Sequence, residues 1–145
     1  MFYGNLQPSY PQLCGEKLYW LQPVLERDGA AGLYMLDLAA SDAQPQLVSP
    51  QGMEPKSKVH EYGGRSYLVA GEYAFFVNAS DQQIYRLTIK TGELLKISGD
   101  DQYRYTDFLL AADGDCLICV AERVVDGANN ENMIDETTAR FNDEL

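Results

Sequence analysis

Short apolar runs separated by turn residues are the feature of this sequence that most restricts its fold. Each run spans about five to eight residues, and pairs such as Asp-Gly and Thr-Gly stand between the runs. No stretch before the C-terminal tail shows the period of a helix. The sequence therefore predicts an antiparallel all-β protein with strands at residues 17–22, 32–38, 45–49, 66–70, 73–78, 83–89, 93–98, 107–111 and 115–120.

The groups of expected strands resemble one another. Leu33-Tyr34-Met35-Leu36 returns as Ile84-Tyr85-Arg86-Leu87, and Phe75-Phe76-Val77 returns as Ile118-Cys119-Val120. Spacings of about 40 to 55 residues are typical of propeller blades, each built from four strands. We therefore expect about three consecutive four-stranded antiparallel blades of a β-propeller over residues 1–125. A series of hairpins in a sandwich is the alternative. For the acidic tail, residues 126–145, we expect a short helix or disorder.

The net charge of −11, from 22 acidic and 11 basic residues, argues against two classes of partner. Such a surface repels nucleic-acid phosphates and anionic lipid headgroups. The apolar runs are also far too short to span a membrane, and no signal peptide is readable. These observations predict a cytoplasmic protein that binds neither nucleic acid nor membrane.

Cys14, Cys116 and Cys119 are the only cysteines. Cys116 and Cys119 form a C-x-x-C pattern inside an expected strand, where residues three apart point to opposite faces and lie about 10 Å apart. That separation is too large for a disulfide. We therefore interpret them as core cysteines. With one histidine and dispersed acids, we expect no metal site and no cofactor.

One stretch of the chain resembles a known family. Val59-His60-Glu61-Tyr62-Gly63-Gly64 is followed by a strand, a glycine turn and Phe75-Phe76-Val77-Asn78. Upstream stands Tyr19-Trp20-Leu21, and downstream Arg104-Tyr105-Thr106-Asp107-Phe108. This order resembles the N-terminal β-propeller of prolyl oligopeptidase-type serine peptidases, in particular acylaminoacyl-peptidase and dipeptidyl-aminopeptidase-like members. The resemblance covers roughly residues 15–122. Arg65 departs from it, because the family more often has a small residue there.

The resemblance implies a two-domain enzyme in which the propeller filters access to a separate α/β-hydrolase domain with the Ser-Asp-His triad. This sequence contains no G-x-S-x-G nucleophile elbow. No catalytic residue of the family has a counterpart here, so we expect a non-catalytic propeller segment that acts as an interaction or gating module. The alternative is a free-standing module that binds a peptide or small ligand through loops such as 41–46 and 78–83.

The candidate ligand contacts are His60, Glu61, Tyr62 and Arg65. Adjacent residues of a strand point to opposite faces, so His60 and Glu61 would not converge on one reacting atom. This favours a structural histidine over a catalytic one. Gly63-Gly64 indicates backbone relief, a bulge or a positive φ, before the next strand.

The length of the chain predicts exposed blade faces. Propellers close with at least about four blades, and 145 residues provide roughly three. A three-bladed monomer is incomplete and leaves two apolar faces in water, which costs about 25 cal/mol for each Å². We therefore expect self-association or a missing companion segment, with a peptide as a further possible ligand.

Overall fold

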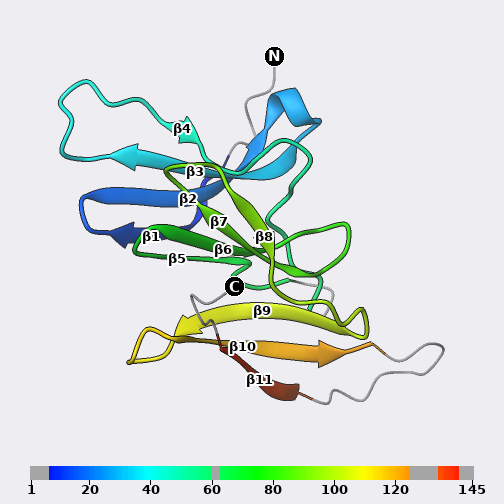
Figure 1. The fold of residues 1–145 in the computed structure, drawn as a ribbon. Helices are drawn as coiled ribbons and strands as arrows, with labels where there is room; N and C mark the ends of the chain where they lie inside the picture. Colours follow the sequence, from blue (N-terminus) through cyan, green and yellow to red (C-terminus); the bar gives the residue numbers. More distant parts are fainter. Residues whose placement is uncertain (1–6, 60–62, 125–133, 141–145) are drawn as a thin grey trace.

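The computed structural model describes residues 7–59 and 63–124, together with the backbone of residues 134–140. In these residues the chain forms three antiparallel sheets and no α-helix (Figure 1). The elements are β1 (Ser9–Cys14), β2 (Lys17–Val24), the 3-10 helix η1 (Leu25–Arg27), β3 (Ala30–Asp37), β4 (Gln46–Leu47), β5 (Tyr67–Ala70), β6 (Tyr73–Val77), β7 (Ile84–Thr88), β8 (Leu94–Lys96), β9 (Tyr103–Leu110), β10 (Cys116–Arg123) and β11 (Ile134–Arg140).

Each sheet is a meander of strands that follow one another in the chain. Blade 1 has the order β1-β2-β3-β4 and blade 2 the order β5-β6-β7-β8. Blade 3 contains β9, β10 and β11, so three of its strands lie in the described part of the chain. Figure 1 shows the three sheets stacked one after another with blade 2 in the middle. The predicted succession of antiparallel propeller blades is confirmed.

Two strands lie where the sequence predicted none. β1 contains Pro11 and a bulge at which Tyr10 takes a φ of 51°, and these interruptions hide the two-residue alternation of a strand. β11 lies in the tail for which a short helix or disorder was expected. Residues 134–140 instead form a strand, and all seven of them pair with β10, from Glu122↔Ile134 to Cys116↔Arg140. The rest of the tail lies outside the described residues.

The core lies between the blades rather than within one sheet. One cluster joins blades 1 and 2, and its fully buried members include Leu33, Tyr67 and Phe76. A second cluster joins blades 2 and 3 and includes Phe108 and Leu117. Blade 2 supplies both clusters because alternate residues of a strand point to opposite faces. This explains why β6 is almost wholly apolar.

The internal repeat seen in the sequence is an equivalence of positions in space. In blade 1, Trp20 stands opposite Tyr34 and stacks on it, with ring centroids 5.9 Å apart. In blade 2, Phe76 stands opposite Tyr85 and stacks on it, also at 5.9 Å. Such cross-strand aromatic pairs stabilise a sheet beyond the area they bury. The two blades therefore use one aromatic pair at the same place.

Candidate functional site

The predicted ligand loop is only partly described. His60, Glu61 and Tyr62 lie outside the described residues, and Gly63, Gly64 and Arg65 lie within them. Gly63 has a φ of +76°, and a Cβ there would stand 2.8 Å from the carbonyl oxygen of Ser57. The backbone relief expected at this glycine is therefore present, because a side chain would meet both strain and a clash.

Arg65 is held at the junction between blades 2 and 3. Its backbone N–H donates to Oδ1 of Asp107 at 2.9 Å, and its carbonyl oxygen accepts from the N–H of Asp107 at 2.9 Å. The guanidinium carbon lies 5.7 Å from the centre of the Tyr67 ring, a cation–π distance. The backbone of Arg65 thus joins two blades, while its side chain lies against the aromatic core.

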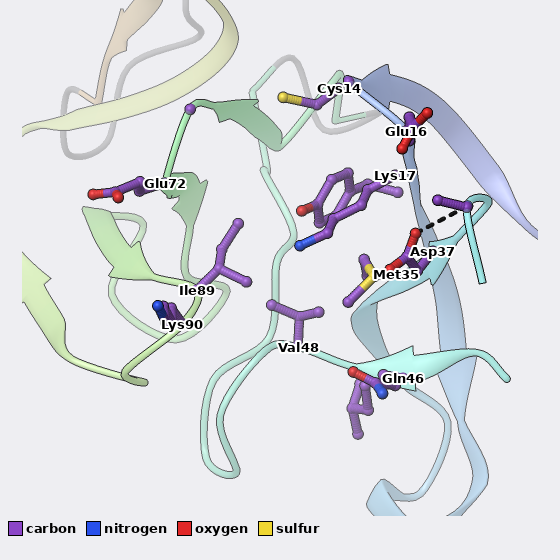
Figure 2. Close-up of a pocket in the computed structure, with 15 residues that line it drawn as sticks. Cys14, Glu16, Lys17, Met35, Asp37, Gln46, Val48, Glu72, Ile89 and Lys90 are labelled. Atoms are coloured by element: carbon purple, nitrogen blue, oxygen red, sulfur yellow. Dashed lines mark hydrogen bonds between the residues drawn. The ribbon is translucent and has the colours of Figure 1, made fainter. Parts of the chain in front are cut away.

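A cleft of about 950 Å³ lies between blades 1 and 2, where their hairpin turns gather. Its floor is apolar and consists of Tyr19, Met35, Val48 and Ile89. In Figure 2 the side chains of Lys17, Met35, Val48 and Ile89 point toward the middle of the cleft, and Glu16 lies at its edge. The sequence did not single out this cleft, because its walls come from four turns far apart in the chain.

Charges of both signs surround the apolar floor. Lys17 and Lys90 are basic, whereas Glu16, Asp37 and Glu72 are acidic. The Asp37 carboxylate accepts a hydrogen bond from the N–H of Ala39 at 3.0 Å. Burial, and secondarily the nearby Cys14, raises the pKa of Tyr19. The Tyr19 phenol therefore stays neutral near pH 7. The cleft combines an apolar floor with a rim that is close to charge balance.

The two loops named from the sequence differ in role. Residues 41–46 lead to Gln46 at the wall of the cleft. Residues 78–83 instead use their polar groups internally. Asn78 Oδ1 accepts from the N–H of Glu54 at 3.0 Å, and Gln82 Oε1 accepts from the N–H of Lys58 at 2.8 Å. This loop therefore fixes the segment that enters blade 2.

Asp81 is the ionic centre of the same loop. It accepts a hydrogen bond from the Tyr85 hydroxyl at 2.6 Å and lies 3.5 Å from the Lys96 ammonium. Burial opposes ionisation of Asp81, but these partners together with Gln83 and Asn78 lower its pKa. The Asp81 carboxylate is thus engaged in a turn, as expected for a structural acid.

Of the three cysteines predicted as core residues, only Cys119 is buried, while Cys14 lies half-buried at the cleft. Cys119 is 3% exposed and belongs to the cluster between blades 2 and 3, and Cys116 is half-buried. None of these three cysteines, all of which lie in the described residues, forms a disulfide. In the described part of the chain no group of three or more metal-binding side chains gathers. Nor does any described helix have the length and apolar character needed to cross a membrane.

The outward faces of blades 1 and 3 form a second candidate site. On blade 1 the face consists of two cross-strand rows, Leu13-Leu18-Leu36 and Trp20-Tyr34-Leu47. On blade 3 it contains the opposed pair Leu109 and Ile118. Leu13 is 62% exposed, Leu47 37% and Leu109 65%, whereas Trp20 is only 9% exposed. Apolar surface therefore faces water at both ends of the stack, and on blade 1 it is greatest at Leu13 and Leu47. We call these surfaces the blade 1 outer face and the blade 3 outer face.

Two four-stranded meanders and a third sheet of three described strands, with cores between them, define this chain as propeller blades. Among solved structures it matches a puromycin-hydrolyzing peptidase of Mycobacterium tuberculosis, with a TM-score of 0.72 and 26% identity, over 94% of this chain and 21% of that chain. It also matches puromycin hydrolase, with a TM-score of 0.74 and 17% identity, over 92% of this chain and 22% of that chain. A mutant of puromycin hydrolase complexed with PGG gives the same TM-score and identity, over 90% of this chain and 21% of that chain.

These matches confirm the resemblance to oligopeptidase-type peptidases. The chain spans about a fifth of the length of the peptidases it matches. No family model and no curated protein matches the sequence. The likeness therefore concerns a part of the peptidase fold.

Proposed function

We propose that this chain is a non-catalytic propeller segment that acts as an interaction or gating module. Its blade 1 and blade 3 outer faces join further propeller blades, and the ring so formed restricts access to a catalytic domain on another stretch of polypeptide. The observation that carries this proposal is the pair of apolar outer faces, each with exposed leucines, on a stack of blades that otherwise bury such faces against one another.

Two further observations support the proposal. The matched segment is about a fifth of each peptidase chain, and the sequence contains no nucleophile elbow. The gain from covering an apolar face, about 25 cal/mol for each Å², gives the segment a strong tendency to associate. A module of this kind requires no cofactor or metal.

The first test asks whether the segment replaces its counterpart in a relative. The chain is grafted in place of the matched segment of the Mycobacterium tuberculosis peptidase, and hydrolysis of puromycin is measured. We expect the graft to retain hydrolysis, and we expect the isolated chain to show neither hydrolysis nor labelling by a fluorophosphonate. A graft that is folded but inactive, or one that does not fold, would contradict the proposal. Labelling of the isolated chain would contradict the non-catalytic assignment.

A second candidate function rests on the cleft between blades 1 and 2. A small binding site has an apolar body and a few polar groups that orient the ligand, and this cleft has both. Its mixed rim fits a zwitterionic ligand, such as a short peptide with free ends. The carboxylate of the peptide would face Lys17 and Lys90, its amine would face Glu16 and Glu72, and an apolar side chain would lie on the floor.

Calorimetric titration with the dipeptide leucyl-leucine tests this second function. We expect saturable binding that weakens at least about fivefold in Lys17→Glu, because an attractive charge becomes repulsive. Lys58→Glu is the matched control, since Lys58 is exposed and does not line the cleft. The capped analogue, acetyl-leucyl-leucine amide, should bind more weakly. Equal affinity for the free and capped peptides would remove the basis for the proposal.

A further inference from the structure

We propose that a second copy of this chain covers the blade 1 outer face, so that two copies join head to tail. The blade 3 outer face of one copy packs on the blade 1 outer face of the other. This inference deepens the proposed interaction function and depends on it. The outer faces correspond to the two halves of the blade-to-blade interfaces inside the chain.

The blade 1 outer face occupies the positions that blade 2 uses to pack on blade 1. Because the pair Trp20–Tyr34 is equivalent to Phe76–Tyr85, the row Leu13-Leu18-Leu36 is equivalent to a row of blade 2. The residues of that blade 2 row are Val69, Ala74, Leu87 and Leu94, and all four belong to the cluster between blades 1 and 2 or pack against it. The blade 1 outer face is thus one half of a blade-to-blade interface.

The blade 3 outer face is the other half. The pair Leu109–Ile118 is equivalent to Leu68–Phe75 of blade 2, because Ile118 follows the repeat Phe75-Phe76-Val77. The alternation of side chains along β10 agrees with this equivalence. Cys119 faces blade 2, so its neighbour Ile118 faces away from blade 2. Leu68 and Phe75 pack against the cluster between blades 2 and 3. Ile118 therefore stands where the next blade would be received.

A second copy fits these halves because each chain carries both. The rows Leu13-Leu18-Leu36 and Trp20-Tyr34-Leu47 and the pair Leu109–Ile118 contain no charged residue. Glu122 lies on the same face of β10 as Ile118, but four residues away and opposite Arg104, so this acid lies toward the edge of the contact. Contact between them would repeat the packing seen twice within the chain, with the same strand rows opposed.

Head-to-tail contacts form a closed ring where the rotation between copies permits it. Two copies of a stack of three sheets fall within the range of about four to eight blades that closed propellers use. A closed pair covers all four outer faces at once. Its total buried area would then come from two blade-to-blade interfaces rather than one, which favours a stable dimer.

Light scattering coupled to size-exclusion chromatography tests the proposal, with circular dichroism to check that each variant is folded. We expect the wild type at twice its 16.2 kDa mass. Leu13→Asp and Leu109→Asp should each be monomeric, since each damages one half of every contact. Leu25→Asp is the matched control, because Leu25 is 63% exposed but lies in η1 outside both faces, and it should remain dimeric.

Mixing the two variants separates the head-to-tail arrangement from a symmetric one. Leu109→Asp keeps its blade 1 outer face and Leu13→Asp keeps its blade 3 outer face, so an equimolar mixture retains one intact contact and should form a one-to-one dimer that is weaker than the wild type. A mixture that stays monomeric at high concentration would overturn the head-to-tail arrangement. A dimer of Leu109→Asp alone would show that two blade 1 faces meet, and this would overturn the proposal. A monomeric wild type would overturn it too. An active graft in the peptidase together with a monomeric wild type would leave the interaction function intact and reject only the second copy.

Discussion

Gln12 and Val69 are joined by two hydrogen bonds across the junction of blades 1 and 2. The side-chain amide nitrogen of Gln12 donates to the carbonyl oxygen of Val69 at 2.6 Å, and the amide oxygen of Gln12 accepts from the N–H of Val69 at 2.9 Å. The side chain thus takes the place of a neighbouring strand at the edge of β5. This satisfies two backbone groups that a sheet edge would otherwise leave unpaired.

Gln12→Ala should destabilise the protein by about 1–3 kcal/mol. The substitution leaves the partly buried N–H and carbonyl of Val69 without their partners. Urea unfolding followed by circular dichroism gives the free energy. Gln51→Ala, at an exposed position in a turn, is the control and should change stability by less than about 0.5 kcal/mol. Equal effects of the two substitutions would show that the paired bond contributes nothing.

Gly64→Ala should destabilise the junction of blades 2 and 3 by about 1–3 kcal/mol. A Cβ at position 64 would overlap Oγ1 of Thr106 and stand 3.3 Å from its Cγ2. Gly99→Ala, with no atom within 4 Å of its Cβ, should be nearly neutral. If this overlap is the cause, the double variant Gly64→Ala/Thr106→Ala should lose less stability than the sum of the two single variants. If the two losses of free energy of unfolding simply add, the overlap with Thr106 is not the cause.

Alkaline pH should destabilise the protein through Tyr67. Burial raises the pKa of Tyr67 to about 12, against the opposing effect of Arg65. Above pH 10 the unfolded state releases the phenol proton while the folded state keeps it, so this contribution to stability is complete below about pH 10 and is lost as pH rises to about 12.

The free energy of unfolding, measured in urea at several pH values up to about 12, checks this expectation. Tyr67→Phe should show a shallower fall with pH than the wild type. Phe75→Leu, which weakens packing and removes no titrating group, should keep the wild-type slope. The expectation fails if Tyr67→Phe and the wild type fall in parallel.

Cys119 should resist thiol reagents in the folded protein. Burial raises the pKa of its thiol to about 11, and only 3% of the residue is exposed, so little thiolate forms and little reagent reaches it. Alkylation with iodoacetamide at neutral pH, read by peptide mass spectrometry, should modify Cys14 and Cys116 first. In urea, Cys119 should be alkylated to the same extent as the other two cysteines. Equal modification of Cys116 and Cys119 without urea would contradict the buried position.

Local patterns in the sequence were sufficient to predict the parts of the fold that depend on residues close together in the chain. The alternation at residues 83–89 predicted β7. The aromatic repeats predicted similar blades, and the stacked pairs Trp20–Tyr34 and Phe76–Tyr85 occupy equivalent positions in blades 1 and 2. Gly63 was predicted as a point of backbone relief and has a positive φ. These features follow from side-chain period and backbone sterics, which act over a few residues.

Other features were decided only by the tertiary structure. β1 is interrupted by a bulge, and β11 is polar, so each is recognisable as a strand only by its partner, β2 or β10. The cleft requires four turns to meet, and Arg65 finds Asp107 some forty residues away along the chain. The sequence determined the strand and turn chemistry and the apolar rows. The packing of blade on blade decided which rows are buried, because burial depends on what lies opposite each face.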